Sequence, residues 1–537
     1  MAYLTKGLIL IQFFILSCGT GGFEKFWDRA HQVRHPSTSD LKAGMATGTS
    51  YVVGVPEGQV DSFQQAFGES GGLSGSLKIL GTVKDEDGAP LTAFQMEFDE
   101  ITPTILDAWL SDGLIAYAEP DWKSKIHVDD RDYGRLALTY RQELSSAHWL
   151  NQINLSAAFD AIDAGGVGLR SLSDGPIIAV LDSGVDIQHP ALSGRIFQNK
   201  GGDAGCQGSF FGCNATASQL DSFGDGQVWP VGTESFGQRC LSPDRSVETI
   251  CSHGTHVAGI IAAKVQEGYG GICPSCRILP IKVVDGSAGD FGAIYDSSLI
   301  AALNYVRELR GRGEPIKIVN ASFGKFRRSK TLGLLIKELA SGDQGVLFVA
   351  AAGNENTAKE PYPASLDEVL AVANVDSQTM IRDTSSNFGS WVDLAAPGSG
   401  DCGAGSGIRS SVPGGSDQCS RGTSFAAPVV SGVAGLLWAS WPQMTLTELR
   451  TRLMATSNPA LYEVKANEAF GYNQQKMLGA GIIDALAAVE GTVRIDVSQN
   501  QKIRQGCGIV GLSMAGWSPL LFLFGPLLGC VMLRSRS

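Results

Sequence analysis

Histidine and charged residues are both scarce in this sequence. Only 7 of the 537 residues are histidine, and Asp, Glu, Lys and Arg together make up 18%. The net charge is −12, and no long run of Lys and Arg interrupts the acidic balance. A nucleic-acid groove needs clustered cations, so the composition argues against nucleic acid as a partner. Any reaction that needs an imidazole after Trp149 must use one of three residues: His189, His253 or His256.

The spacings of a zinc site are also missing. The chain has one C-x-x-C pair, Cys273 and Cys276, whereas a structural zinc site needs a second pair of ligands. His253 and His256 form an H-x-x-H pair that lacks the glutamate of the H-E-x-x-H zinc helix. A metal site is therefore the weaker interpretation of both pairs, and no metal ligand can be assigned.

The first 18 residues have the layout of an export signal. Lys6 precedes the apolar run 7–16, and a small residue comes before Cys18. The run is too short to cross a bilayer as a finished helix. Residues 15–18 also resemble a bacterial lipobox, in which the cysteine becomes a lipid-bearing N-terminus. The alternative is a plain signal peptide with an incidental cysteine.

Residues 509–537 have the composition of a membrane or sorting tail. Ile509 to Leu533 contains no charged residue and is followed by two arginines, which suits a spanning helix with a cytoplasmic end. With Cys507 ahead of it, the tail is similar to three-part bacterial sorting signals that are cut near a cysteine; the alternative is a buried C-terminal hairpin. We therefore expect a bacterial cell-envelope protein, anchored outside the cytoplasm or released.

Export would place the cysteines in an oxidising compartment, where disulfides form. Eight of the 11 cysteines lie between residues 201 and 420 and are spaced as near neighbours. Local pairing is expected, although spacing alone does not fix connectivity. The predicted pairs are Cys206–Cys213, Cys240–Cys251, Cys273–Cys276 and Cys402–Cys419.

Residues 48–125, after an expected linker at 19–47, have the pattern of a small α+β domain. Thr102 is expected to cap its second helix, with Pro103 at the first helical position. The order strand, helix, strand, strand, helix, strand is the ferredoxin-like arrangement, which by itself predicts no function. The elements are strands 51–55, 77–83, 91–98 and 114–118 and helices 60–67 and 103–113.

Between residues 147 and 491, short apolar strands alternate with longer helices, and a linker is expected at 492–508. This pattern predicts an α/β domain with a central, mainly parallel sheet and functional groups at the strand ends. The predicted strands are 176–181, 278–284, 317–319 and 346–350, and the clearest helices are 257–266, 297–309 and 426–438.

Residue types suited to nucleophilic catalysis stand at the ends of these elements. Asp182 ends the first strand, and Asn354 follows the strand run VLFVAAAG. His253 is expected to open a helix, and Ser424 to stand just before another. A serine hydroxyl is a poor nucleophile unless a base takes its proton and a third group orients that base.

Three motifs carry a resemblance to a known family. DSGVDIQHP around Asp182, HGTHVAGIIAA from His253 and GTSFAAPVVSG around Ser424 resemble the subtilisin-like serine proteases, in the order Asp, His, Ser. Further matches, among them KIVNASFG and VAAAGNEN, extend the resemblance over residues 147–489. It implies the three-layer subtilisin-like fold and an endopeptidase that acts on protein or peptide substrates and needs no cofactor for its chemistry.

The resemblance also implies a role for each matched residue. Ser424 would be the nucleophile, His253 the general base, and Asp182 the carboxylate that orients the imidazole. Asn354 would join the Ser424 backbone N–H in the oxyanion hole. Three ordinary alternatives remain: Asp182 as a strand-end turn former, for which Asp186 is the more natural candidate, Ser424 as a helix N-cap, and Asn354 as a left-handed turn residue. The other two histidines after Trp149 are expected to be structural.

Substrate and metal binding are implied less sharply. Pro361 stands where many relatives have a glycine on the pocket floor, so we expect a shallow pocket that favours medium-sized apolar side chains. Ala191 replaces an aspartate that often ligates calcium in relatives, so a structural calcium ion has no assigned site. Residues 197–250 form a longer stretch than in simple relatives, expected as a disulfide-braced excursion near the cleft rim. The residues implied to line the cleft are Ser322, Phe323, Gly324, Ala351, Ala352 and Gly353.

The same resemblance makes the small domain a propeptide that assists folding and then inhibits the enzyme. GLIAYAEPDW, which ends at Trp122, resembles the close of such a domain. Its last strand would lead the chain into the substrate cleft, and self-cleavage between Ser124 and Ser146, around the processing linker 126–146, would release the mature enzyme. A lipid on Cys18 would stay with the propeptide, so only the C-terminal tail would then hold the active enzyme at the membrane.

Two other function classes are weighed against the peptidase. A catalytically dead surface-binding module would be expected to lose a member of the triad, and none is lost. A metal hydrolase would need a third ligand near HGTH. A label that reacts with an activated serine and is insensitive to a chelator would separate the three classes.

Overall fold

The protein is described here by a computed structural model. Predictions about the export signal, Cys18, the C-terminal tail and Cys240 fall outside the described residues. Those residues are 50–69, 75–98, 103–121, 123–126, 147–165, 171, 174–199, 206, 210–216, 245–266, 269–284, 292–469 and 477–494.

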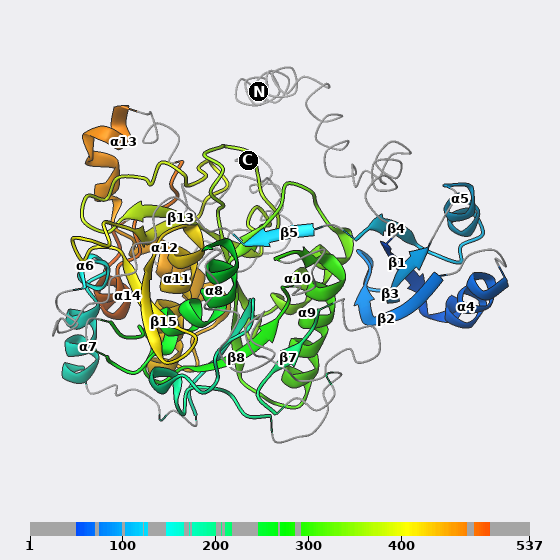
Figure 1. The fold of residues 1–537 in the computed structure, drawn as a ribbon, viewed down its shortest axis with the longest axis horizontal. Helices are drawn as coiled ribbons and strands as arrows, with labels where there is room; N and C mark the ends of the chain where they lie inside the picture. Colours follow the sequence, from blue (N-terminus) through cyan, green and yellow to red (C-terminus); the bar gives the residue numbers. More distant parts are fainter. Residues whose placement is uncertain are drawn as a thin grey trace, which may run out of the picture. The chain divides into compact units, whose positions relative to one another are not determined.

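The N-terminal part forms a four-stranded antiparallel sheet with the order β2-β3-β1-β4. This order and the two helices confirm the ferredoxin-like arrangement (Figure 1). Apolar side chains of α4, α5 and one sheet face build its core, in which the rings of Phe63 and Trp109 meet edge to face with centroids 5.5 Å apart. The elements are β1 (Ser50–Pro56), η1 (Glu57–Gln59), α4 (Val60–Glu69), β2 (Gly75–Lys84), β3 (Pro90–Phe98), α5 (Pro103–Ser111) and β4 (Tyr117–Pro120).

Strand β4 begins later than the sequence predicts. The predicted strand was 114–118, but the N–H groups of Leu114 and Ile115 both donate to the Trp109 carbonyl, at 2.9 and 3.3 Å. They close the C-terminal end of α5, where Gly113 has a φ of 70°. Extended pairing can start only after these two residues, so the apolar run at 114–115 belongs to the helix cap.

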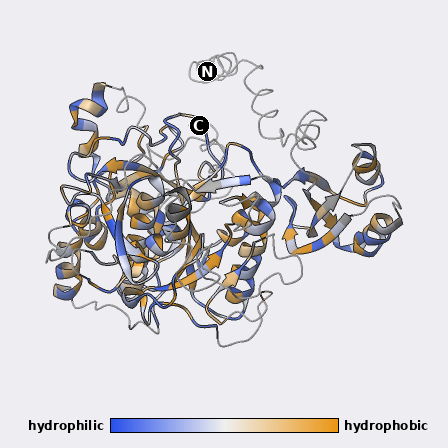
Figure 2. Ribbon diagram, viewed as in Figure 1, coloured by the Kyte–Doolittle hydropathy of each residue, from blue (hydrophilic) through white to orange (hydrophobic). Residues whose placement is uncertain are grey.

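A seven-stranded sheet with the order β14-β13-β12-β10-β6-β8-β7 forms the centre of the larger part. Every pairing in it is parallel, which confirms the predicted central sheet. Figure 2 shows β8 as strongly hydrophobic, as expected for a strand covered on both faces. The strands are β6 (Ile177–Asp182), β7 (Cys213–Asn214), β8 (Arg277–Lys282), β10 (Ile316–Ala321), β12 (Leu347–Ala351), β13 (Val369–Asp376) and β14 (Leu394–Ser399).

Helices cover both faces of this sheet and complete the three-layer fold. Along β6, Ile177, Ala179 and Leu181 belong to one core with α9 and α10, whereas Ile178 and Val180 belong to a second core with α8 and α11. This alternation follows from the two-residue period of a strand. The remaining elements are α6 (His148–Gln152), α7 (Leu155–Ala164), η3 (Pro190–Leu192), α8 (Arg245–Ala262), α9 (Asp296–Gly311), α10 (Lys330–Leu339), β15 (Ile408–Val412), β16 (Ser416–Ser420), α11 (Thr423–Ser440), α12 (Leu446–Ala455), η4 (Pro459–Glu463), α13 (Lys465–Ala469) and α14 (Ala485–Glu490).

Helix α11 is long and apolar enough to cross a membrane, but all of its residues are buried inside the protein. It contacts β10, β12, β13 and β14 from the second core. Length and composition therefore reflect its place as the central core helix of this layer.

Three of the predicted disulfides are present: Cys206–Cys213, Cys273–Cys276 and Cys402–Cys419. Cys251 is also disulfide-bonded, and its predicted partner Cys240 lies outside the described residues. The excursion at 197–250 contributes β7, which pairs with β8 at the edge of the central sheet. The first disulfide thus braces the segment that leads into this edge strand.

The chain that leaves the small domain adds a strand to the larger part. Strand β5 (Lys123–Ile126) lies between β11 (Phe323–Gly324) and β9 (Ile294–Tyr295) and is antiparallel to both. The sequence did not predict this pairing, because residues 123–126 alternate between charged and uncharged side chains without a strand-like apolar face. Strand β2 also contacts α9 and α10, so the small domain packs against the same layer of helices.

Candidate active site

Asp182 and His253 form a buried pair at the carboxyl end of β6. Nδ1 of His253 lies 2.7 Å from Oδ1 of Asp182, and each residue is 1% exposed. Because an ionised carboxylate only accepts, Nδ1 carries the proton and Nε2 is left with its lone pair. Nε2 is buried and has no hydrogen-bond partner among the described residues. The backbone N–H of Ser183 also donates to Oδ1, at 2.7 Å, and fixes the carboxylate.

His253 lies inside helix α8, so the expectation that it opens a helix was wrong. The helix begins at Arg245, more than two turns earlier. Gly254, a residue of low helix propensity, has a packing function inside this helix. A Cβ added there would lie 2.2 Å from the carbonyl oxygen of Gly184 and 3.1 Å from the Asp182 Cβ. The missing side chain lets α8 approach the end of β6 closely enough for His253 to reach Asp182.

Ser424 is the second residue of α11, and not the residue just before it. The N-cap is Gly422, with a φ of 137°, so the alternative in which Ser424 caps the helix was wrong. The Ser424 hydroxyl donates to the Ser322 carbonyl at 2.9 Å, and the Ser322 hydroxyl donates to the Ser424 carbonyl at 2.8 Å. These reciprocal bonds join the first turn of α11 to the residue that follows β10.

Asn354 follows β12 and faces the first turn of α11. Its Oδ1 accepts from the backbone N–H of Thr423 at 3.1 Å and from the Thr423 hydroxyl at 2.9 Å. Two donors on the oxygen orient the amide, and Nδ2 is buried with no partner among the residues that the structure describes. The left-handed residue is Gly353, with a φ of 97°, so the turn alternative for Asn354 was wrong.

The other two histidines after Trp149, His189 and His256, have structural contacts, as predicted. The Nε2–H of His256 donates to the Gln418 carbonyl at 3.0 Å, and its ring meets the Phe425 ring edge to face. Burial lowers the pKa of His256 to about 3, so it stays neutral near pH 7. Nδ1 of His189 caps the next turn, and its Nε2 lies 2.8 Å from the Ser416 carbonyl.

The residues predicted to bind substrate lie on two segments near Ser424. Phe323 and Gly324 form β11, which pairs with β5, and Ser322 contacts Ser424 directly. Ala351 ends β12, Ala352 donates to the Val372 carbonyl at 2.9 Å, and Gly353 donates to the Thr423 hydroxyl at 3.1 Å. The second segment therefore fixes the corner that carries Asn354. Substrate binding by either segment stays a prediction.

The described residues contain no group of three or more His, Cys, Asp and Glu side chains placed to hold a metal ion. Ala191, at the position where a calcium-ligating aspartate was considered, is buried in η3. The structure thus assigns no ligand set for the calcium ion left open by the sequence.

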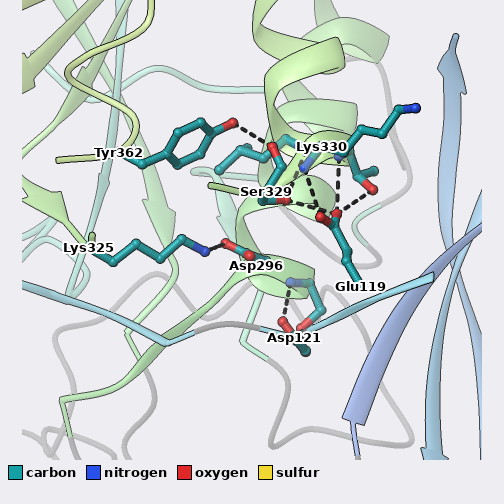
Figure 3. A network of polar contacts seen from close by, with 10 residues as sticks. Glu119, Asp121, Asp296, Lys325, Ser329, Lys330 and Tyr362 are labelled. Atoms are coloured by element: carbon teal, nitrogen blue, oxygen red, sulfur yellow. Dashed lines mark hydrogen bonds and ion pairs between the residues drawn. The ribbon is translucent and has the colours of Figure 1, made fainter. Parts of the chain in front are cut away.

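A cluster of buried carboxylates was missed by sequence reasoning. Glu119 and Asp121, from the chain that joins the two parts, lie beside Asp296 and Lys325 of the larger part (Figure 3). The ammonium of Lys325 bonds to Asp296, and both side chains are buried. Burial, reinforced by the two neighbouring carboxylates, raises the pKa of Asp296 to about 7. Burial also raises the pKa of Asp121.

Comparisons with known proteins agree with this geometry. The Peptidase_S8 model, described as the subtilase family, matches residues 173–481. Subtilisin E of Bacillus subtilis (strain 168) is 30% identical over 286 residues, which cover 52% of this chain and 60% of the relative. The cell wall-associated protease of the same organism is 33% identical over 297 residues, 55% of this chain and 27% of that protein. The chain thus spans 60% of the length of subtilisin relatives such as Subtilisin NAT.

A solved structure shows the same fold. The crystal structure of fervidolysin from Fervidobacterium pennivorans, described as a keratinolytic enzyme related to subtilisin, superposes with a TM-score of 0.56 at 23% identity. The match covers 83% of this chain and 61% of the other. With the family match over more than half of the sequence, the chain belongs to the subtilase family.

Proposed function

We propose that the protein is a serine endopeptidase that hydrolyses peptide bonds through a Ser-His-Asp triad and is made as a self-processed zymogen. The observation that carries this proposal is the buried contact of 2.7 Å between His253 Nδ1 and Asp182, which leaves Nε2 as the base. The His253 ring lies 5.3 Å from the ring of Phe425, the chain neighbour of Ser424, which supports a position for Ser424 near this base.

The reaction begins with Ser424 turning from the Ser322 carbonyl toward His253 Nε2. Its oxygen attacks the substrate carbonyl carbon while the proton passes to Nε2, and the imidazolium then gives this proton to the leaving amine. Water repeats the sequence on the acyl-enzyme and regenerates the serine. A hydroxyl that is not yet on its base is common before substrate binds, because catalytic hydrogen bonds tighten in the complex.

Asn354 supplies the oxyanion hole together with the Ser424 backbone N–H. We expect Asn354→Leu to lower kcat by roughly 100- to 1,000-fold with little change in KM, a figure that comes from subtilisin itself. Asn354→Asp tests the Nδ2 donor alone, because the variant keeps the Oδ1 that accepts from Thr423 and removes Nδ2. Steady-state kinetics of both variants provide the measurement. Near-normal kcat in Asn354→Asp would show that Nδ2 does not stabilise the oxyanion.

Extended peptides are the proposed substrates, and the pairing of β5 supports this proposal. Strand β5 forms an antiparallel ladder with β11 through the pairs Phe323↔Ile126 and Gly324↔Lys125. Strand β9 pairs with the other edge of β5. Adding a strand to exposed edges gives affinity through backbone hydrogen bonds and leaves specificity to side-chain pockets. The shallow pocket proposed from Pro361, with its preference for medium-sized apolar side chains, would supply part of that specificity.

The small domain, residues 48–125, is the proposed propeptide. Its β2 contacts α9 through Asn304, whose amide donates to the Leu80 carbonyl at 3.0 Å, and through Arg307, whose guanidinium donates to the Thr82 carbonyl at 2.6 Å. Together with β5 beside β11, these contacts support a domain that blocks the substrate position until the chain is cut between Ser124 and Ser146. Protein substrates and this propeptide are the proposed partners, and nucleic acid is not.

We place the protein outside the bacterial cytoplasm, in the cell envelope or released from it. Disulfides in the described part support this, since they persist in oxidising compartments. The family includes a relative named as cell wall-associated. The export signal at 1–18, a lipid on Cys18 and a membrane tail at 509–537 remain proposals from the sequence.

Labelling with a fluorophosphonate tests the catalytic assignment. The mature protein should react at Ser424, because only a serine activated by a base attacks this reagent. His253→Ala should abolish labelling, while the matched control His148→Ala, an exposed histidine on α6, should leave it unchanged. A chelator should have no effect. Hydrolysis that a chelator stops, without labelling, would point to a metal hydrolase, and absence of both would leave a binding module.

A further inference from the structure

The carboxylate of Glu119 is held by four donors at the N-terminus of α10. Its Oε1 accepts from the Ser329 hydroxyl at 3.0 Å, the Thr331 N–H at 3.1 Å and the Thr331 hydroxyl at 2.7 Å. Its Oε2 accepts from the Lys330 N–H at 2.7 Å. Figure 3 shows the carboxylate aligned on the first turn of the helix. This arrangement is a complete binding site for a carboxylate, and the small domain supplies the ligand.

A second carboxylate occupies the N-terminus of α9. Asp121 accepts from the Ser297 N–H at 2.9 Å and from the Ser297 hydroxyl at 2.5 Å. The next residue of this turn, Ser298, is 1% exposed, and its hydroxyl has no hydrogen-bond partner among the described residues. The first turn of α9 therefore holds one carboxylate and contains a further buried polar group that its own neighbours leave unpaired.

Both sites lie on the larger part and remain when the small domain leaves. The N–H groups of a first helical turn have no partner within the helix, and the helix dipole favours negative charge there. Lys330 adds a positive charge beside the first turn of α10. Its Nζ lies 3.8 Å from the Glu86 carboxylate of the small domain, so it already pairs with an acidic group. We call Ser297, Ser329, Lys330 and Thr331 the acid-binding site. Loss of the small domain removes Glu86, Glu119 and Asp121 from this site, whereas Asp296, the first residue of α9, stays and is paired with Lys325.

Chain direction fixes where a substrate would meet this site. Lys123 of β5 pairs with Tyr295, and Glu119 and Asp121 lie four and two positions before it in the same chain. An extended peptide bound in place of β5 would carry its own upstream residues over the same two helix termini. The donors are backbone N–H groups and short hydroxyls at fixed positions, so they select a carboxylate at a given spacing.

We propose that, in the mature enzyme, the acid-binding site recruits protein substrates through acidic residues located four and two positions before the residue that pairs with Tyr295. This inference rests on the proposed endopeptidase function and on β5 marking the substrate strand. The expected substrates are proteins with a Glu-x-Asp or similar acidic pair upstream of the cut bond.

Three fluorogenic peptides test the inference with mature enzyme released from the full chain. The first has the sequence of residues 119–130, the second carries Gln and Asn in place of Glu119 and Asp121, and the third begins at Lys123. We expect kcat/KM for the acidic peptide to exceed that for its neutral match by about ten-fold, mainly through KM. Equal values for these two peptides would overturn the inference.

A paired variant locates the effect on the acid-binding site. The double variant Ser297→Ala with Thr331→Val removes the two hydroxyl donors and should erase most of the acidic preference. Ser341→Ala, just beyond the other end of α10, is the matched control and should keep it. The peptide that begins at Lys123 lacks the acidic pair and therefore reports on folding of the enzyme. The wild type, the double variant and Ser341→Ala should cleave it equally. A preference that survives in the double variant would contradict the assignment, and no cleavage of any peptide would instead refute the proposed function.

Discussion

Replacement of Ser424 by alanine is expected to stop self-processing and to remove nearly all peptidase activity. The full-length precursor should persist on a gel, and kcat on a peptide substrate should fall on the order of a million-fold, the size measured for the equivalent loss in subtilisin. The reason is that the proposed mechanism depends on Ser424 as its nucleophile, both for substrate and for the cut in the linker. Ser322 contacts Ser424, but its hydroxyl donates to the Ser424 carbonyl.

The matched control for this variant is Ser440→Ala. Ser440 ends the same helix, and its hydroxyl donates to the Leu436 carbonyl at 3.0 Å, so the change tests α11 without touching the proposed nucleophile. Its precursor should be processed normally and its melting temperature should stay close to that of Ser424→Ala. Normal processing of Ser424→Ala would show that another protease cuts the linker and would contradict self-cleavage.

The parts of this fold that the sequence predicts are those with local signals. Strands β6, β8 and β12 are apolar runs bounded by polar residues, and each forms within two residues of its predicted limits. Disulfides such as Cys402–Cys419 join near neighbours, so a prediction of local pairing found them. The candidate catalytic residues stand at element ends inside long motifs, and the structure brings Asp182 and His253 together as the motifs imply.

The features that the sequence did not predict depend on contacts between distant segments. Glu119 meets Thr331 across 212 positions of the chain, and no local pattern marks a glutamate as the cap of a remote helix. Residues 123–126 form strand β5 because their backbone pairs with β11 and β9, and not because their side chains favour a strand. The close approach of Gly254 in α8 to Gly184 is also a contact that propensity alone does not reveal. Tertiary contacts overrode the local signal in each case.

Replacement of Asp182 by asparagine is the second change with a large expected effect. We expect kcat to fall by roughly 10,000-fold, as in other proteases with this triad, while the fold is kept. In the wild-type chain Oδ1 accepts from both His253 Nδ1 and the Ser183 N–H. If the asparagine NH2 takes the place of Oδ1 toward the ring, Nδ1 must accept and Nε2 must carry the proton, and the Ser183 N–H loses its acceptor. A protonated Nε2 cannot take the proton of Ser424.

Asp186→Asn provides the matched control, because this carboxylate lies four residues further on and has only loop partners. It accepts from the Gln188 N–H at 3.0 Å and from the Gly414 N–H at 2.9 Å, and neither belongs to the proposed triad. Its kcat should stay within about three-fold of the wild type, since a loop hydrogen bond to a carboxylate contributes about 1.5–3 kcal/mol to stability and nothing to the reaction. Comparable kcat values for the two asparagine variants would mean that Asp182 does not set the tautomer of His253. A large loss confined to Asp182→Asn, with an unchanged melting temperature, would assign the effect to the orientation of the imidazole and not to the stability of β6.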